Sequence, residues 1–172
     1  LDVLRRLDNQ FGNRIQTLYS TQDAVEEMAM KADLIIGAVL IPGASAPKLI
    51  TRDAVKSMSS GTAMVDVAID QGGCFETSHA TTHDEPTYIV DDVVHYCVAN
   101  MPGAVARTSA AALNNATLPY VLALANHGIF CALRNDPHLM NGLNVHEGKI
   151  TNKFVAAAHE LEYVSPAQAG LI

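Results

Sequence analysis

The stretch DLIIGAVL, residues 33–40, is an almost unbroken apolar run, and it decides the predicted fold class. A continuous apolar run of this length is typical of a strand that is buried on both faces of a parallel sheet. Two similar runs follow at residues 62–69 and 93–99. Helices are predicted between the strands, at residues 20–31 and 51–61, as parallel connections require. The sequence therefore predicts an α/β fold with a doubly wound parallel sheet.

The region before this run continues the alternation of helices and strands. Leucines at helical spacing predict a helix over residues 1–11, which ends at Gly12. Residues 14–20 are predicted to form a further strand. Ser20 is the predicted cap of the second helix, and Thr51 that of the third.

The character of the sequence changes after Arg107, because no charged residue occurs from Thr108 to Leu133. Such a run indicates either a transmembrane helix or a buried helix of a soluble protein. Polar residues interrupt the run at Asn114, Asn115, Thr117, Asn126 and His127. They favour the buried soluble helix, with a kink at Pro119 and a break at Gly128.

The last forty residues or so read as short elements. Asp136 and Pro137 predict the start of a helix that ends at Gly142. Residues 144–150 are predicted to be a short polar strand or loop, and Thr151 is the predicted cap of a final helix over residues 152–161.

Composition excludes several classes of protein. The chain has 172 residues and a net charge of −7, so a nucleic-acid or anionic-membrane partner is not expected. Its three cysteines lie far apart, which indicates neither a disulfide framework nor a zinc site. Charged residues follow Leu1 closely, so no secretory leader is predicted. A start without Met, in a helical stretch, indicates a piece of a longer protein.

Ligands of doubly wound sheets bind at the carboxyl ends of the strands. The segments to inspect are therefore residues 39–43, 70–73 and 100–103, each of which follows an apolar run. Asp66 lies in the middle of a predicted strand, and we expect it to be a hydrogen-bonded structural group. Asp70 lies at the strand end before two glycines, where a turn-forming role and a ligand-binding role are equally compatible with the sequence.

The histidines do not indicate a metal site. His79 and His83 are four residues apart, but the threonines and proline around them make a helix improbable, so solvated loop positions are expected. His95 is expected to be a hydrogen-bonded core residue, and His127 a packed residue of the long helix. No glycine-rich GxGxxG turn, Walker loop or nucleophile elbow is present. Taken alone, the residues support a fragment of an α/β ligand-binding domain.

Three long stretches carry a family resemblance. They are ADLIIGAVLIPGASAPKLIT (residues 32–51), MVDVAIDQGGCFETSHATTHDEPTY (64–88) and HYCVANMPGAVARTSAAALNNATLPYV (95–121). The chain resembles the carboxy-terminal half of the alanine dehydrogenases, a family related to the cofactor-binding part of the nicotinamide nucleotide transhydrogenases. The similarity runs along essentially the whole chain.

The resemblance implies a fold, an activity and a setting. It implies a partial Rossmann-type sheet followed by a long helix and a small helical return into a substrate domain. Residues 1–106 would be the later part of the NAD-binding domain, and residues 107–172 the connecting helix and part of the substrate domain. The implied activity is reversible oxidative deamination of L-alanine to pyruvate and ammonia with NAD. The enzyme would be cytoplasmic and a homo-oligomer, as a hexamer, with no nucleic-acid or membrane partner.

The resemblance also implies roles for individual residues. Asp70 matches the catalytic aspartate and lines the nicotinamide end. Ser20 matches a position on the adenosine side of NAD. The other cofactor-binding positions are Val39, Leu40, Val67, Ala68, Ile69, Val98, Ala99, Asn100 and Met101.

Some family features are not found in this sequence. The phosphate-binding loop, the catalytic histidine and the residues that bind the substrate carboxylate would lie before Leu1, so the chain alone is expected to be inactive. In some members a glutamate and a histidine of the long helix bind a metal. His127 is retained, but Ala123 occupies the acidic position, so no metal is predicted. The alternatives are a transhydrogenase subunit and a truncated, non-catalytic assembly module.

Overall fold

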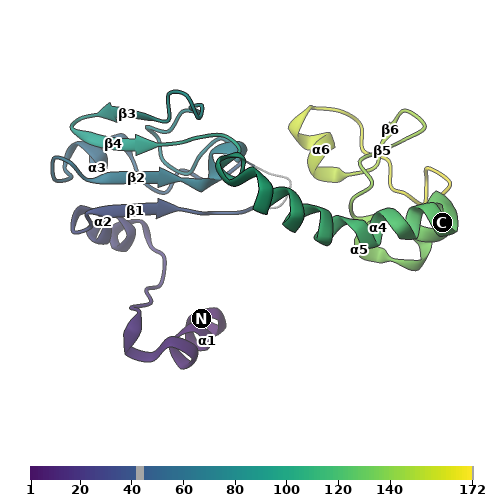
Figure 1. Cartoon of the computed structure of the whole chain (residues 1–172), viewed down its shortest axis with the longest axis horizontal. Coiled ribbons are helices and arrows are strands. Elements are labelled where there is room, and N and C mark those ends of the chain that lie inside the picture. The colour runs from purple at the N-terminus through teal and green to yellow at the C-terminus, as the bar shows by residue number, and fades with distance from the viewer. Residues whose placement is uncertain (42–44, 172) are drawn as a thin grey trace. The chain divides into compact units, whose positions relative to one another are not determined.

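The computed structural model describes residues 1–41 and 45–171, which divide into two compact units (Figure 1). The first unit holds Leu1–Ile41 and Ser45–Met101, and the second holds the described residues from Pro102 onward. Each unit has its own buried residues and is described separately.

A four-stranded sheet organises the first unit, in the order β1-β2-β4-β3 (Figure 1). The strands are β1 (Leu34–Gly37), β2 (Ala63–Asp66), β3 (Thr87–Val90) and β4 (Val93–Tyr96). β1, β2 and β4 are parallel, with Ile35 beside Met64 and Met64 beside His95. The predicted α/β fold and its three parallel strands are therefore confirmed.

β3 is an antiparallel edge strand that the sequence analysis missed. It joins β4 through a tight turn in which Asp91 and Asp92 have φ values of 50° and 63°. Such a turn matches the twist of a hairpin but requires positive φ at both central residues, which glycine and asparagine usually supply. Two aspartates gave no strong turn signal, and Pro86 made the segment read as a loop.

Two helices pack on one face of the sheet and form the core with it. α2 (Gln22–Met30) and α3 (Arg52–Lys56) contribute Ala29, Ala54 and Val55, which pack with Met64, Phe75 and Val93. The side chain of Thr51 caps α3, as predicted. The cap of α2 is Thr21 and not Ser20, because the Thr21 hydroxyl accepts the hydrogen bond from the Ala24 amide. α3 ends at Lys56, earlier than predicted.

The opposite face of the sheet is largely uncovered in this chain. Leu34 and Ile36 of β1 are 56% and 61% exposed, and Ile89 of β3 is 69% exposed. The prediction that β1 is buried on both faces is therefore wrong for this chain. The cause is that both packed helices lie on the side of Ile35 and Met64, the alternate residues of the same strands.

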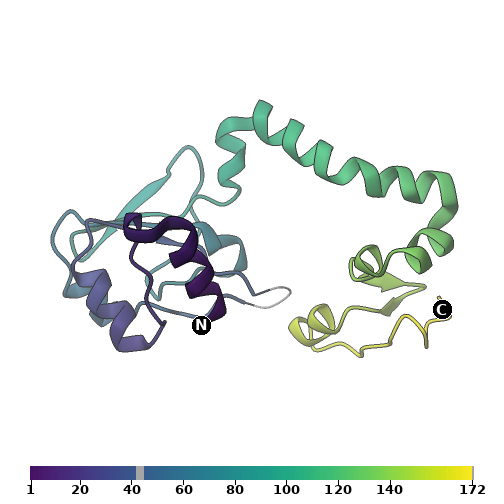
Figure 2. The same cartoon turned by 90° about the horizontal axis from the view of Figure 1, so that it is seen from below.

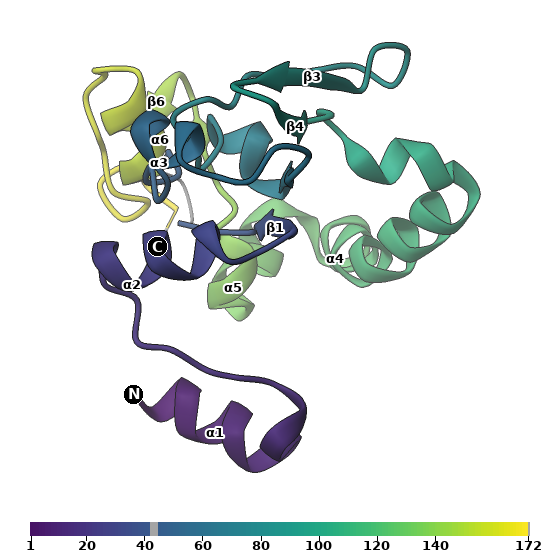
Figure 3. The same ribbon diagram turned by 90° about the vertical axis from the view of Figure 1, so that its left-hand side faces the viewer.

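The predicted strand over residues 14–20 is not formed. α1 (Asp2–Phe11) ends at Gly12, as predicted, and a short 3-10 turn, η1 (Gly12–Arg14), follows. The chain then runs on to α2 without pairing to any described strand (Figure 3). β-branched and aromatic residues favour extended backbone, but a strand also needs a neighbour that accepts its hydrogen bonds.

The strands that precede the candidate site end earlier than their apolar runs. β2 ends at Asp66, and the chain turns into a 3-10 helix, η2 (Val67–Gln71). This turn bends residues 67–71 over the carboxyl end of the sheet, so the strand predicted over residues 62–69 stops at Asp66.

The second unit begins at Pro102, within η3 (Met101–Val105), and continues into the long helix α4 (Ala106–Asn135). α4 bends near its C-terminal end (Figure 2), where Gly128 has the non-helical values φ 73° and ψ 163°. The predicted break is thus confirmed, and Pro119 lies inside the helix.

The predicted burial of α4 is wrong for this chain, because its buried residues are only Ala132 and Leu133. Most of its other residues are exposed. By length and composition the helical segment Met101–Asn135 is long and apolar enough to cross a membrane.

The rest of the second unit is small. α5 (Pro137–Met140) is capped by the Asp136 carboxylate, as predicted. β5 (Val145–His146) and β6 (Lys149–Ile150) form a hairpin. α6 (Lys153–Ala158) is capped by Asn152 and not by Thr151, whose hydroxyl donates to the Leu143 carbonyl.

We predict that Gly37→Ala destabilises the first unit by steric overlap alone. A Cβ at Gly37 would lie 2.3 Å from Cys74 Sγ and 2.6 Å from Phe75 Cζ. Forcing an extra methyl group into a packed core costs about 1–3 kcal/mol of unfolding free energy, which urea denaturation would measure. Ala38→Ser, at the exposed neighbouring position, is the control. An unchanged denaturation midpoint for Gly37→Ala would refute the packing described here.

Candidate functional site

A pocket of about 260 Å³ lies at the carboxyl ends of β1 and β2. The residues that follow these two strands line it: Ala38, Val39, Leu40, Val67, Ala68, Asp70 and Gln71. Because β1 and β2 are parallel, their carboxyl ends meet at the same edge of the sheet. The pocket is therefore where the strand order predicted a ligand site.

Asp70 contributes the carboxylate of this pocket. It lies in η2, and its side chain is exposed. None of the described residues donates a hydrogen bond to its carboxylate, so no turn-forming bond of Asp70 is seen among them.

Gln71 is a second polar group of the pocket, and the sequence analysis did not select it. Its Oε1 atom is buried and has no hydrogen-bond partner within the described part of the chain. Leaving a buried acceptor unpaired costs about 1–3 kcal/mol.

Asp66 lies beneath the pocket loop and has the structural role that was predicted. Its fully buried carboxylate accepts hydrogen bonds from the Cys74 amide at 2.8 Å and the Ser78 hydroxyl at 2.6 Å. The Cys74 thiol donates to its other oxygen at 3.5 Å. Burial, and then the Asp66 charge, raise the pKa of Cys74 to about 12. Cys74 is therefore a neutral structural group and not a nucleophile.

The structure brings five of the predicted site residues together and leaves the others outside the pocket lining. Val39, Leu40, Val67, Ala68 and Asp70 line the pocket. Ile69 and Val98 are buried, Met101 is half-buried, and Ser20, Ala99 and Asn100 are exposed.

The segment after β4 ends at the same edge of the sheet as the pocket, since β4 is parallel to β2. Asn100 has a positive φ of 57°, and its carbonyl lies 3.0 Å from His83 Nε2. Asn100 therefore lies beyond the carboxyl end of β4, which is the neighbour of β2, the strand that precedes Asp70.

The remaining histidines are outside the pocket. His79 and His83 are exposed, as predicted. His127 was expected to be packed but is exposed, because α4 is uncovered over that stretch. Within residues 1–41 and 45–171, no group of three or more His, Cys, Asp or Glu side chains is placed to hold a metal ion.

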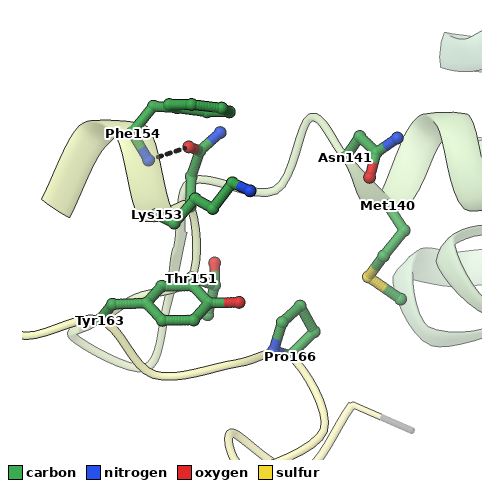
Figure 4. A pocket seen from close by; sticks show the side chains of 8 residues that line it. Met140, Asn141, Thr151, Lys153, Phe154, Tyr163 and Pro166 are labelled. Carbon is green, nitrogen blue, oxygen red and sulfur yellow. Dashed lines mark hydrogen bonds between the residues drawn. The ribbon is translucent and has the colours of Figure 1, made fainter. Parts of the chain in front are cut away.

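A larger cavity of about 590 Å³ lies in the second unit (Figure 4). Figure 4 shows Lys153, Phe154 and Tyr163 on one side and Met140 with Asn141 on the other. None of the predicted site residues lines it, and its lining contains no carboxylate or imidazole for acid–base chemistry. The smaller pocket of the first unit is therefore the candidate site.

A parallel sheet with a ligand pocket at its carboxyl edge defines a Rossmann-type α/β domain. The model of the family "Alanine dehydrogenase/PNT, C-terminal domain" matches residues 1–153, and the chain belongs to this family. Alanine dehydrogenase of Halomonas elongata is 63% identical over 164 residues, which are 95% of this chain and 44% of that protein. Alanine dehydrogenase of Mycolicibacterium smegmatis is 54% identical over 98% of this chain and 45% of its own length.

A solved structure titled L-alanine dehydrogenase matches with a TM-score of 0.81 and 48% identity. The match covers 92% of this chain and 44% of that structure's chain. The family resemblance and the Rossmann-type fold are thus confirmed. The chain spans less than half the length of the relatives that it matches.

We predict that His95 makes stability depend on pH. Its Nδ1 donates to the Val93 carbonyl at 3.0 Å, and its Nε2 lies 2.7 Å from the Thr77 hydroxyl. Burial lowers the pKa of His95 below the ordinary 6.5, so the folded state keeps the ring neutral. Below pH 6.5 the His95 ring binds a proton in the unfolded chain but stays neutral in the folded chain. The free energy of unfolding therefore decreases as the pH falls.

The loss should approach about 1.4 kcal/mol per pH unit until the folded-state pKa is reached. Urea denaturation of the wild type and of His95→Gln, at pH values from about 7 down to about 5, measures it. The variant should be less stable at neutral pH but should lose less stability between these limits. Parallel pH profiles would contradict the assignment.

Proposed function

We propose that this chain is the carboxy-terminal half of an alanine dehydrogenase, which converts L-alanine, NAD⁺ and water into pyruvate, ammonium, NADH and a proton. The proposal rests on family membership together with one observation: the carboxylate of Asp70 lies in a pocket at the carboxyl edge of the parallel sheet. The substrate would be a small molecule, and no nucleic-acid partner is expected from the negative net charge.

The pocket residues fit one end of a nicotinamide dinucleotide. Val39, Leu40, Val67 and Ala68 supply the apolar wall, and Gln71 is a polar residue of the same lining. An apolar pocket with a few placed polar groups is what a flat aromatic amide requires. When bound, NAD would supply the hydride acceptor.

Asp70 would act on the substrate. Removal of a hydride from the alanine α-carbon leaves a cationic iminium group, which a nearby carboxylate stabilises. The same carboxylate would orient the water that adds to the iminium carbon before ammonia leaves. Asp70 is exposed in this chain, so the rest of the enzyme would have to keep water away from the pocket for its charge to act strongly.

The other predicted positions would complete the cofactor site. Ser20 would contact the adenosine side of NAD, and Ile69 and Val98, being buried, would act through their backbone. Ala99, Asn100 and Met101 would lie beside the nicotinamide and the substrate. In this proposal the first unit is the later part of the NAD-binding domain, and the second is the connecting helix with part of the substrate domain.

In this proposal the helix α4 is surrounded by protein and not by a membrane. Its exposed apolar surface would be covered by the remaining half of the protein and by other copies in a cytoplasmic homo-oligomer, a hexamer in this proposal. Asn114 and His127 interrupt the apolar stretch, and each would be costly in a bilayer.

We predict that Asp70→Asn lowers the turnover of L-alanine by about 10²–10³-fold in an enzyme of full family length that carries this chain. The amide keeps the shape but removes the charge that stabilises the iminium group. Steady-state kinetics with NAD and alanine measures the change. Asp84→Asn, in an exposed loop, is the matched control and should leave the rate unchanged. An undiminished rate for Asp70→Asn would end the proposed mechanism.

An assay of NADH formation with the same full-length enzyme distinguishes a dehydrogenase from a transhydrogenase subunit and from a non-catalytic assembly module. Only the first forms NADH when L-alanine is added.

We predict that the 172-residue chain alone neither oxidises alanine nor binds NAD tightly, because the pyrophosphate-binding glycine turn is not in its sequence. NADH absorbance and calorimetric titration with NAD test this, with a full-length alanine dehydrogenase as the positive control. Formation of NADH that depends on alanine would refute the prediction.

A further inference from the structure

Lys48 makes two hydrogen bonds that join the chain segments on either side of the candidate site. Its Nζ donates to the carbonyl of Gly72 at 2.7 Å and to that of Gly73 at 2.8 Å. Neither the resemblance nor the pocket lining points to this residue.

The backbone around Lys48 continues the same contact. The Ala46 amide donates to the Gln71 carbonyl at 3.0 Å, and the Leu49 amide donates to the Cys74 carbonyl at 2.7 Å. With the two bonds from Lys48, all four carbonyls from Gln71 to Cys74 are bonded by the segment 46–49. The lysine thus replaces the two main-chain donors that a continuous strand would have supplied.

The conformation of Gly72 and Gly73 explains why a side-chain donor, and not a backbone amide, bonds their carbonyls. Gly72 and Gly73 have φ values of 90° and 76°, so the loop cannot continue a regular strand. A side chain at Gly73 would also collide with Asp66 Oδ2 at 2.8 Å. A flexible ammonium group with three donors reaches both carbonyls where a backbone amide does not.

Asp66 holds the same loop from the other side, through the Cys74 amide and the Ser78 hydroxyl. The loop between Asp70 and Cys74 is therefore held by a buried carboxylate beneath it and by a lysine from the segment 46–49. Asp70 and Gln71 stand at the start of this loop and line the pocket.

We propose that Lys48 is a positioning residue: by bonding the Gly72 and Gly73 carbonyls it fixes the loop that presents Asp70 to the substrate. This inference rests on the proposed function for its kinetic consequence. A small displacement of a reacting group lowers the reaction rate strongly. This loss is larger than the weak binding energy that an exposed lysine would supply to a ligand.

The test is Lys48→Met in the full-length enzyme, which keeps the apolar stem and removes the donors. We expect kcat for alanine to fall by about 10- to 100-fold, with the KM for NAD changed much less. Lys48→Arg, which can still donate twice, should restore most of the rate. Lys56→Met is the matched control: within the described residues Lys56 pairs with Asp53 of its own helix, away from the pocket lining, so this variant should leave both constants unchanged.

A second measurement does not depend on the reaction. The amides of Gly72, Gly73 and Cys74 donate to Ile69 O, Ala68 O and Asp66 Oδ2, and hydrogen exchange reports how well they are held. Lys48→Met should exchange faster than the wild type over residues 70–74, and Lys48→Arg should not. If Lys48→Met does not fold, Lys48→Gln, which keeps one amide donor, is measured in the same way.

The outcomes separate this inference from the proposed function. A raised KM for NAD with an unchanged kcat would mean that Lys48 contacts the cofactor directly, and it would overturn the inference. Unchanged kcat and unchanged exchange would overturn it as well. If the wild-type enzyme does not oxidise alanine, the proposed function fails, and the exchange rates alone decide: faster exchange in Lys48→Met supports the positioning role, and equal exchange overturns it.

Discussion

The Asp66 carboxylate is the group on which the local structure of the site depends. A fully buried carboxylate is costly unless its oxygens are bonded, and here the Cys74 amide and the Ser78 hydroxyl satisfy it. These bonds require the chain to leave β2, turn through η2 and come back over the strand end. This path of the chain requires the positive φ values of Gly72 and Gly73. It places Asp70 and Gln71 at the start of the loop, where they line the pocket. The geometry of the pocket thus follows from the need to satisfy one buried charge.

Much of the first unit was predictable because apolar runs and capping residues are local signals. The runs around Ile35, Met64 and Val94 gave the three parallel strands, and Thr51 gave the start of α3. The failures are non-local. Residues 15–20 have the composition of a strand, but whether a strand forms depends on a neighbour that the local sequence does not specify. β3 was missed for the opposite reason: it is an edge strand with weak local signals that β4 stabilises by pairing.

The candidate site divides in the same way. Asp70, Val39 and Leu40 were found because they lie near the ends of apolar runs and because the family resemblance assigns them to the site, although the runs do not show where each strand ends. Gln71 was passed over, although it stands between Asp70 and the glycines and its oxygen is the orphaned one. Lys48 had no signal at all, since its role depends on two carbonyls that become available only when the glycine pair adopts positive φ. Of the sequence features near the site, the glycine pair comes closest to indicating that a distant donor is needed here.

In this chain, the position of Asp70 and the packing of the sheet depend on different contacts. The loop that presents Asp70 is held by bonds within the first unit, from Asp66 and from the segment 46–49. The apolar face with Leu34 and Ile36, by contrast, has no cover among the described residues, although parallel sheets are stable when both faces are packed. The relatives are more than twice as long, so covering that face is a task that the rest of such a protein can perform. The local bonds would then set the position of the carboxylate, while the covering layer would set how dry the pocket is and how strongly that charge acts.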